Sequence, residues 1–532
     1  MIIPRAKKIK YSKIKYQLGF NFSYSVNEQF GDFAIKWMKN FYSDLIMQKE
    51  EYGLFHFILS NGYNQGAYSI KSEHNISIFY SDKEGARNAA ASIIQLMSFK
   101  EGKGYEFPYV QINDSPDCNF RSVMIDLARG IPNLSRLKED LLRLSLLKCN
   151  FVHFHLMDGG GVCYKTEVFP QKLGIGGQRL LSKAELHDLV AFCEDLGLNV
   201  IPEIEIPAHA DALLYYVPEL ACKTKLNSPS KWCVCAGNEM TYELFDKLIQ
   251  EISEIFPGKY LHIGGDELYF DDIPEMNRHC HWLECERCKA LMEKERLNSI
   301  QEIYYYVINR IYNIVKKYNK QMIVWNDQID VSKAVPISKD IIVQYWRIAN
   351  KNRGPRKGCS FQKILRNGFQ VINSVLTHCY IDDELYANPE KISAFSYLNI
   401  PKTEKKYKNS LIGCEACAWN YGLHDSHYLL SFFFSTGLLL DKMWNVSEVV
   451  YNQKFKIAIT KVLFGAHTPK GYDVCEVFGS IIPPRIDGQC TYAEIKNDLM
   501  DIETLNRHRK IWIAINNTYS TIYKNRLLDC FK

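Results

Sequence analysis

Two adjacent carboxylates, Asp266 and Glu267, are the residues of this chain whose type and spacing most suggest chemistry. They directly follow the apolar run 260–263 and the glycine pair 264–265, which allows the backbone to turn tightly. An ionised side chain is costly to bury unless it is paired, so two acids after a buried strand need a reason. One acid kept protonated beside an ionised neighbour suits general acid catalysis. Two solvated loop acids are the plain alternative, and the motif alone does not decide between them.

The length and the charge of the chain restrict its class. A chain of 532 residues predicts a large catalytic domain with one or two smaller domains. The net charge of +5, from 65 basic and 60 acidic residues, is too mild to indicate a nucleic-acid partner. The longest apolar run, 428–440, is too short for a membrane-spanning helix, so we expect no membrane partner.

Cysteine usage and the first residues bear on the compartment. The 17 cysteines are odd in number and scattered, which suits reduced thiols better than a disulfide framework. The start of the chain lacks the apolar core of a signal peptide, although a trimmed N-terminus would look the same. We therefore expect a cytoplasmic protein.

Residues 1–118 are predicted to form a small α/β domain. The stretches 66–71 and 76–80 alternate between apolar and polar residues, as paired strands do. A helix is predicted over 82–97, with Asp82 as its N-terminal cap. Pro108 and the turn at 113–116 mark the end of this domain.

Strand and helix patterns alternate from residue 120 onward. Helices are predicted at 135–148, 182–196, 242–256 and 298–317. The eight strand candidates are 123–127, 151–157, 200–206, 260–263, 322–325, 341–346, 370–374 and 411–418. This count and order predict an α/β fold with a closed (β/α)8 TIM barrel over 119–445. A mostly helical C-terminal extension is expected over 446–532, without an assigned function.

Polar and aromatic residues fall at the carboxyl ends of these strands, the face where barrel active sites form. Three tryptophans at successive strand ends suggest walls for the apolar face of a sugar, whereas a single one would suggest ordinary packing. The residues at these positions are Arg129, Asp158, Glu203, Glu205, His209, Asp266, Glu267, Trp325, Asp327, Trp346, Tyr380, Asp382 and Trp419.

From about residue 60 to about 445, the chain resembles glycoside hydrolase family 20, the β-N-acetylhexosaminidases. The helix motif GARNAA at 85–90 resembles that of the family's N-terminal domain, and HIGGDE at 262–267 resembles its signature. Further similar motifs follow in the family's order: RSVMIDLAR at 121–129, NFVHFHLMD at 150–158, PEIEIPAH at 202–209, VWND at 324–327, VQYW at 343–346, YID at 380–382 and EACAW at 415–419.

The resemblance implies a retaining reaction in which the 2-acetamido oxygen of the substrate attacks the anomeric carbon. Glu267 would protonate the leaving oxygen and then activate water. Asp266 would orient the acetamide and oppose its developing positive charge, and Tyr380 would hydrogen-bond the acetamide oxygen. No metal or other cofactor is implied.

The resemblance also implies residues that bind the sugar. Arg129 would bind the hydroxyls at positions 3 and 4, and Asp382 other ring hydroxyls. Asp158 and His209 would form a pair that tunes Glu267. The pocket would be walled by Trp325, Trp346 and Trp419.

Two departures from the family pattern affect these expectations. Glycines occupy 159–161, where the family has Asp, Gln and Gly, so we expect a more mobile loop that opens the site. Tyr421 stands where relatives often have a glutamate that binds the hydroxyls at 4 or 6. We therefore expect Tyr421 in the sugar site, where it would affect the preference between gluco and galacto substrates.

Cysteine and histidine groups raise the question of a metal. Cys285 and Cys288 form a Cys-x-x-Cys pair with Cys280 close by, and this pattern occurs in zinc sites. A second such pair is lacking, so the sequence favours cysteines without a metal. His153 and His155 lie on one predicted strand, and we expect at most one of them to face the barrel interior, in a supporting role.

Three functions are open at this point. The first is an exo-acting β-N-acetylhexosaminidase that releases terminal GlcNAc or GalNAc from a carbohydrate substrate. The second is a relative that releases a disaccharide or a substituted hexosamine, as the glycine loop and Tyr421 suggest. The third is a catalytically silent glycan-binding protein, because fold alone does not fix function. The preferred sugar, the linkage and the oligomeric state do not follow from the sequence.

Overall fold

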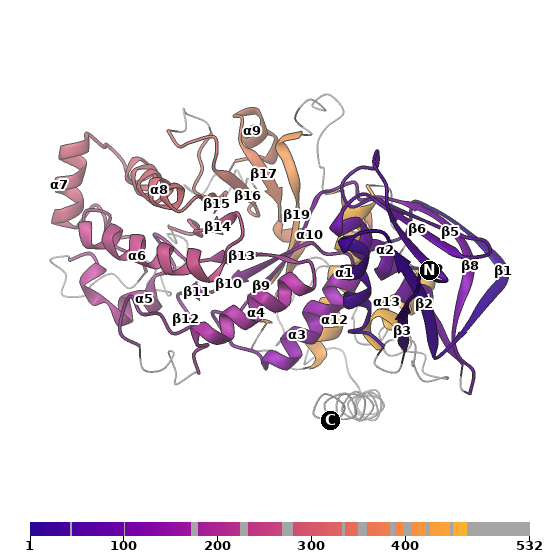
Figure 1. Cartoon of the computed structure of the whole chain (residues 1–532). Helices are drawn as coiled ribbons and strands as arrows, with labels where there is room; N and C mark the ends of the chain where they lie inside the picture. Colours follow the sequence, from indigo (N-terminus) through magenta and orange to yellow (C-terminus); the bar gives the residue numbers. More distant parts are fainter. Residues whose placement is uncertain are drawn as a thin grey trace, which may run out of the picture.

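A computed structural model describes the chain in two α/β units, an N-terminal sheet domain and a barrel (Figure 1). The described residues are 1–42, 45–100, 102–171, 179–223, 232–268, 280–331, 336–348, 359–382, 389–396, 407, 409–421, 426–446 and 451–464.

The N-terminal unit is a mixed sheet covered by two helices. Helices α1 (Gln29–Met38) and α2 (Lys83–Leu96) pack on each other and on the sheet. The sheet order is β1-β8-β5-β6-β4-β2-β3, with β7 beside β8. The strands are β1 (Lys8–Gly19), β2 (Asn21–Val26), β3 (Ile46–Lys49), β4 (Phe55–Leu59), β5 (Tyr68–Ser72), β6 (Ile76–Tyr80), β7 (Ser98–Lys100) and β8 (Gly104–Asp114).

Two local predictions for this unit, the strand pair and the helix cap, are confirmed. Strands β5 and β6 pair antiparallel. The Asp82 side chain caps α2 by accepting a hydrogen bond from the Gly85 amide at 2.7 Å. The boundary predicted near residue 118 falls between β8 and the next strand, which begins at Phe120.

Eight parallel strands close into a barrel, as predicted. Closure comes from the last strand, which pairs with both the first strand and the seventh. The strands are β9 (Phe120–Asp126), β10 (Phe151–His155), β13 (Asn199–Glu203), β14 (Tyr260–His262), β15 (Gln321–Trp325), β16 (Ile342–Tyr345), β17 (Gln370–Asn373) and β19 (Leu411–Ala418). A short strand, β18 (Tyr380–Ile381), extends the sheet beside β19.

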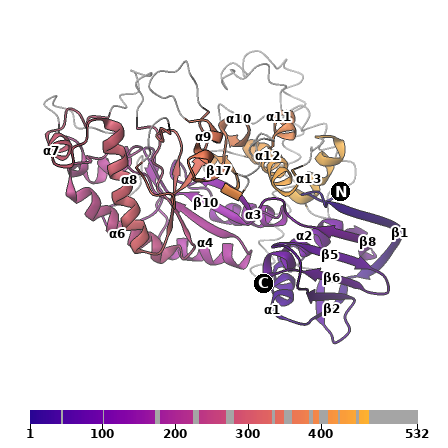
Figure 2. The ribbon, with the colours of Figure 1, turned by 90° about the horizontal axis from the view of Figure 1, so that it is seen from above.

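Helices surround the barrel (Figures 1 and 2). Helix α3 shows the reason for the arrangement, because its leucines at 137, 141 and 144 are fully buried on one face. The larger helices are α3 (Leu134–Leu146), α4 (Lys183–Asp195), α6 (Glu239–Ile255), α8 (Ile300–Lys317) and α12 (Ser426–Trp444). Shorter elements are β11 (Met157–Asp158), β12 (Gly161–Val162), α5 (Asp211–Tyr216), the 3-10 turn Pro218–Leu220, α7 (Glu286–Glu295), α9 (Phe361–Arg366), α10 (Leu376–Cys379) and α11 (Pro389–Ala394).

The C-terminal part is described only in its first portion. Helix α13 (Gln453–Phe464) packs against α12 and α3, and the rest of the predicted extension, 465–532, lies outside the described residues. Among the described helices, none is both long enough and apolar enough to span a bilayer.

The barrel interior is layered. An apolar layer at the amino ends of the strands contains Phe120, Ile201, Ile323, Ile342 and Ile372. A polar layer follows, and then a second apolar layer toward the carboxyl ends contains Met124, Trp325, Tyr380 and Cys417. Side chains that fill a barrel in layers make it a packed core rather than a channel.

The polar layer corrects one expectation. His153 and His155 both face the interior, because residues two apart on a strand point to the same side. His153 lies 3.0 Å from Glu415 and 3.1 Å from Glu203, and His155 also contacts Glu203. Buried histidine–carboxylate pairs therefore support the floor of the barrel's carboxyl end.

Candidate active site

His209 is the centre of a cluster of acids at the carboxyl ends of the strands. Its Nδ1 atom lies 3.2 Å from Asp158. Its Nε2 atom lies 3.5 Å from the Asp266 carboxylate and 3.4 Å from that of Glu267. Segments that follow three strands, β10, β13 and β14, thus bring together four of the residues singled out in the sequence.

The glycine pair after β14 makes the turn that presents the two acids. Gly264 and Gly265 have φ values of +64° and +84°, a backbone conformation that residues other than glycine rarely adopt. A Cβ atom on Gly264 would lie 1.6 Å from Glu205 Oε2, so the backbone rests directly on that carboxyl. The Tyr304 hydroxyl fixes the turn by donating to the Gly265 carbonyl at 2.9 Å.

Glu267 is held through its backbone and leaves its carboxyl partly accessible. Its amide donates to Asp327 Oδ2 at 2.8 Å, and its carbonyl accepts a hydrogen bond from the Trp232 indole at 2.9 Å. The Trp232 ring also packs on His209, with centroids 4.4 Å apart. The side chain of Glu267 is 17% exposed, so its carboxyl can contact a ligand without moving.

The charges in this cluster are unequal. Burial raises the pKa of Asp266 to about 8, and Asp327 and Glu267 add to the rise although His209 opposes it. Burial also raises the pKa of Asp158, but Arg129 and His209 outweigh this and hold it well below its usual range. Burial lowers the pKa of His209, but Asp266 and Asp158 raise it well above normal. At neutral pH, Asp158 is therefore ionised while His209 and Asp266 carry protons.

Arg129 connects the cluster to the rim. Its guanidinium pairs with Asp126 at 2.9 Å and Asp158 at 2.7 Å, and it lies over the Trp419 ring at 4.9 Å. The Asn420 amide donates to Asp126, and its side chain lies 3.4 Å from the Asp382 carboxylate. Arg129 and Asp382, both expected to bind sugar hydroxyls, are therefore joined through one hydrogen-bonded rim.

Aromatic side chains form a wall beside the acids. The rings of Trp346 and Tyr380 stack with centroids 5.9 Å apart, and Tyr380 contacts Trp419 at 5.7 Å. Trp325 lies 6.2 Å from Trp419 and donates its indole N–H to Glu203 at 2.8 Å. The Trp346 indole donates to Asp327 at 3.1 Å. The structure thus brings together the aromatic residues predicted as the pocket wall and fixes two of them by carboxylates.

Tyr421 does not belong to this group, which corrects the expectation from the sequence. Its side chain is fully buried against Phe432, and its hydroxyl donates to Asp140 of α3 at 2.5 Å. The preceding residue, Asn420, has φ +55°, and this left-handed turn separates Trp419 on the site from Tyr421 in the core.

The glycine loop after Asp158 is a tight hairpin. Asp158 pairs with Gly161 across β11 and β12, and the Gly160 amide donates to the Asp158 carboxylate at 2.9 Å. A Cβ atom on Gly161 would lie 2.5 Å from the Ala128 carbonyl oxygen, and one on Gly159 would lie 2.8 Å from Asp211. These glycines permit close packing, which the structure supports in place of the expected opening of the site.

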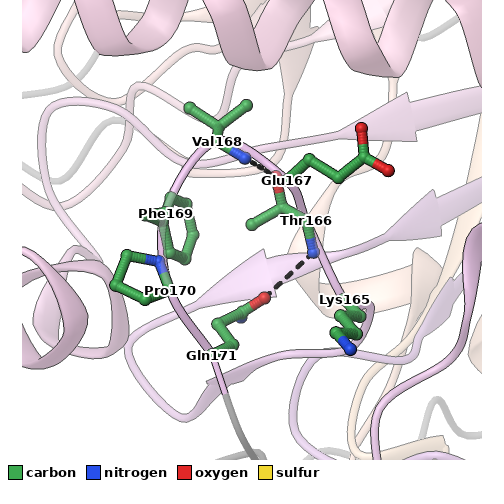
Figure 3. A pocket seen from close by; sticks show the side chains of 7 residues that line it. All are labelled: Lys165, Thr166, Glu167, Val168, Phe169, Pro170 and Gln171. Carbon is green, nitrogen blue, oxygen red and sulfur yellow. Dashed lines mark hydrogen bonds between the residues drawn. The ribbon is translucent and has the colours of Figure 1, made fainter.

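A surface hollow lies further along the same connection (Figure 3). Residues 165–171 line this hollow. The Thr166 amide donates a hydrogen bond of 3.0 Å to the side-chain oxygen of Gln171 and so joins the two ends of this segment. None of the residues predicted to act on a substrate lines this hollow.

Among the described side chains, four groups are close enough to share a metal ion, and two of these lie outside the polar layer of the barrel. His209, Asp266 and Glu267 are close enough to share an ion. The second group is formed by four cysteines near α7, Cys222, Cys235, Cys285 and Cys288.

Comparison with known proteins identifies a family. Residues 118–439 match the family described as "Glycosyl hydrolase family 20, catalytic domain". A β-hexosaminidase of Porphyromonas gingivalis is 27% identical over 303 residues, which are 53% of this chain and 37% of that protein. A β-hexosaminidase of Vibrio furnissii is 23% identical over 437 residues, which are 76% of this chain and 68% of that protein. The match thus spans about a third of the first relative and about two thirds of the second.

Solved structures share the fold. An exo β-N-acetylglucosaminidase of Vibrio harveyi in complex with N-acetylglucosamine has a TM-score of 0.74 at 21% identity, covering 87% of this chain and 76% of that one. A β-N-acetylhexosaminidase of Bacteroides fragilis has a TM-score of 0.73 at 22% identity, covering 87% and 95%.

Proposed function

Because this chain belongs to glycosyl hydrolase family 20, we propose that it is an exo-acting β-N-acetylhexosaminidase that cleaves terminal N-acetylhexosamines from glycans. One observation carries the proposal: the two acids that follow β14 lie against His209 and beside an aromatic wall. General acid chemistry and a surface for a sugar ring then occupy one place. That wall consists of Trp325, Trp346, Tyr380 and Trp419.

Glu267 is the proposed general acid. It protonates the leaving oxygen and then removes a proton from the attacking water. Support comes from its backbone, which Asp327 and Trp232 hold in place, and from its partly exposed carboxyl. His209 and the ionised Asp158 form a charged pair, and His209 of this pair contacts the Glu267 carboxylate and helps to position it.

The proposed nucleophile is the acetamide oxygen of the substrate itself, which the site holds close to the anomeric carbon. Asp266 orients the acetamide N–H, and Tyr380 donates to its oxygen. The raised pKa of Asp266 means that the free protein holds a proton there at neutral pH. A positive charge develops on the acetamide as its oxygen attacks and favours the ionised form of this carboxyl, so this step is expected to release that proton to solvent.

Arg129 and Asp382 are the proposed ligands of the ring hydroxyls, because the Asn420 bridge holds both at one rim. The release of a disaccharide is not favoured. Tyr421 lies outside the site, and the glycine loop is a closed hairpin, so neither feature that suggested this alternative widens the pocket.

The proposal is tested with three aryl glycosides: the β-N-acetylglucosaminide, its galacto epimer and the plain β-glucoside. We expect turnover of at least one acetamido substrate, essentially none of the glucoside, and inhibition by a thiazoline that mimics the cyclised intermediate. Asp266→Asn should strongly reduce kcat, because it removes the charge that opposes the intermediate. Good turnover of the glucoside, together with a fluorosugar trapped on any carboxylate, would show a protein nucleophile instead.

A further inference from the structure

Four buried cysteines from separate parts of the chain meet beside α7. The sulfur of Cys222 lies 3.9 Å from that of Cys288. Cys235 lies 3.6 Å from both Cys285 and Cys288. All four sulfurs lie within 4.8 Å of one another, and none of the four is in a disulfide. The proposed hydrolysis does not use these thiols, so their close grouping requires another explanation.

The distances between these sulfurs match one particular occupant. Four thiolates about 2.3 Å from a single zinc ion, in tetrahedral positions, lie about 3.8 Å from one another. A disulfide requires about 2.05 Å, far less than the separations seen here. We propose that Cys222, Cys235, Cys285 and Cys288 bind one structural zinc ion, and that the four thiols give up their protons on binding it.

The surrounding chain is built to hold this geometry. Cys285 and Cys288 sit at the start of α7, where the helix dipole favours negative thiolates. Arg287 donates to the Ala221 carbonyl at 2.8 Å, and the Trp282 indole donates to the Val234 carbonyl at 2.8 Å. These bonds join α7 to the two segments that carry the other cysteines.

Gly237 shows how close this approach is. A Cβ atom there would lie 2.2 Å from the Arg287 carbonyl oxygen, so only glycine lets the two backbones meet. Ala221 and Val234 also form a bridge that brings Cys222 and Cys235 together. The site is therefore defined by backbone contacts as well as by its thiols.

The proposed ion also has a consequence for the acid cluster. Trp232 lies three residues before Cys235, and its indole holds the Glu267 carbonyl at 2.9 Å. Zinc bound by Cys235 would fix this segment and thereby act as a positioning element for Glu267. Loss of the ion is expected to lower kcat more than it changes KM, because Trp232 supports the proposed acid and not the sugar.

The sequence favoured cysteines without a metal, which the proposed zinc would revise, and it named Cys280 in the group, which the structure corrects. Cys280 instead lies against Cys233, and burial together with this contact raises the pKa of its thiol. Cys222 takes its place, and this residue had no signal in the sequence because it is not part of a Cys-x-x-Cys pair.

The first test measures zinc in protein purified under reducing conditions without added metal. Mass spectrometry of the elements should find one zinc per chain, and an organomercurial that titrates the thiols should release it to a chromogenic chelator. Cys222→Ser and Cys288→Ser should lose the zinc. Cys193→Ser and Cys280→Ser are the matched controls, since both remove buried thiols outside the group, and they should retain it.

A second measurement keeps the proposal decidable if the variants do not fold. Wild-type protein stripped of metal and given Co2+ should develop the charge-transfer bands of tetrahedral thiolate ligation. A wild type that contains no zinc and gives no such bands would overturn the proposal. So would disulfides among the four cysteines in the intact mass, or iron in place of zinc. None of these readouts depends on hydrolysis, so the zinc site and the proposed function can fail separately.

Discussion

Asp266 holds a proton at neutral pH, because burial and neighbouring carboxyls raise its pKa to about 8. An unfolded chain would lose this proton near pH 4. Between about pH 4 and pH 8 the folded state therefore binds more protons than the unfolded state, and stability must fall as the pH rises through that window. The cost is about 1.4 kcal/mol for each pH unit in which only the folded carboxyl is protonated.

Asp266→Asn removes this dependence while it keeps the shape of the side chain. We expect the variant to be more stable than the wild type, by a margin that grows from pH 5 to pH 8. His209 changes the slope in the same direction, because its raised pKa also belongs to the folded state, so the measured slope belongs to the pair. Urea unfolding of both proteins at four pH values measures the margin. Parallel curves would show that Asp266 is ionised throughout.

Glu267→Gln tests the assignment of the acid. We expect kcat for substrates with poor leaving groups to fall roughly a hundred- to ten-thousand-fold, the usual contribution of a general acid. The fall should be smaller for aryl glycosides whose leaving group needs no proton. Glu254→Gln, on the exposed side of α6, is the matched control and should keep its activity. Equal losses on good and poor leaving groups would contradict a general-acid role.

Tyr421→Phe tests the corrected position of that residue. The change removes a hydrogen bond to the buried Asp140, so we expect a loss of roughly 1–3 kcal/mol in the free energy of unfolding. The ratio of kcat/KM for gluco and galacto substrates should stay unchanged. Tyr215→Phe, at a ring that is 73% exposed, should change neither quantity. A shifted ratio would return Tyr421 to the sugar site.

The residues that the structure brings together as the sequence predicted lie within a few residues of a strand end. A strand fixes where its last side chain points, so the order of motifs was enough to predict the cluster around His209. Tyr421 failed because one left-handed residue, Asn420, reverses the direction of the chain after Trp419. A single dihedral angle of this kind leaves no mark in an apolar pattern.

At the scale of elements, all eight barrel strands were predictable from apolar runs between helices. Several predicted strands run past the observed ends; 200–206, for example, is a strand only over Asn199–Glu203. Apolar residues continue into the loops there because the site buries them. The short elements β11, β12 and α5 were not predicted, because packing against neighbours, not propensity, decides such short segments.

Gly264→Ala should break the turn that ends β14. Two effects would lower the free energy of unfolding of this variant: the strain of an alanine at a φ of +64°, and the clash of its Cβ atom, 1.6 Å from Glu205 Oε2. Gly368→Ala separates them, because Gly368 has φ +82° but nothing within 4 Å of its Cβ position. We expect the control to lose roughly 1–2 kcal/mol from backbone strain alone. The Gly264 variant should lose several times more, together with its activity, when both are measured by thermal unfolding and hydrolysis. Similar losses would mean that Glu205 moves aside freely.

At the scale of the molecule, buried polar contacts tie the sheet domain to the barrel. Arg87 of α2 donates to the carbonyl of Gly197 at 2.7 Å, just past the end of α4. Asp114, the last residue of β8, accepts hydrogen bonds from Tyr68 at 2.7 Å, Lys148 at 3.1 Å and the Trp444 indole at 2.8 Å. One carboxylate thus joins the N-terminal sheet to the end of α3 and to α12.

Asp114→Asn should therefore weaken the whole molecule. Lys148 is fully buried, and without the carboxylate its charge would be left unpaired, a loss of roughly 3–5 kcal/mol. Adding Lys148→Met should restore part of this stability, since it removes the unpaired charge. Asp32→Asn, in an exposed pair with Lys49, is the control and should cost at most about 1 kcal/mol. Urea unfolding followed by circular dichroism gives the four values, and hydrogen exchange should quicken in β5 and β8 before it does in β10 and β13. A loss at Asp114 no larger than that at Asp32 would show that the two domains do not depend on this carboxylate.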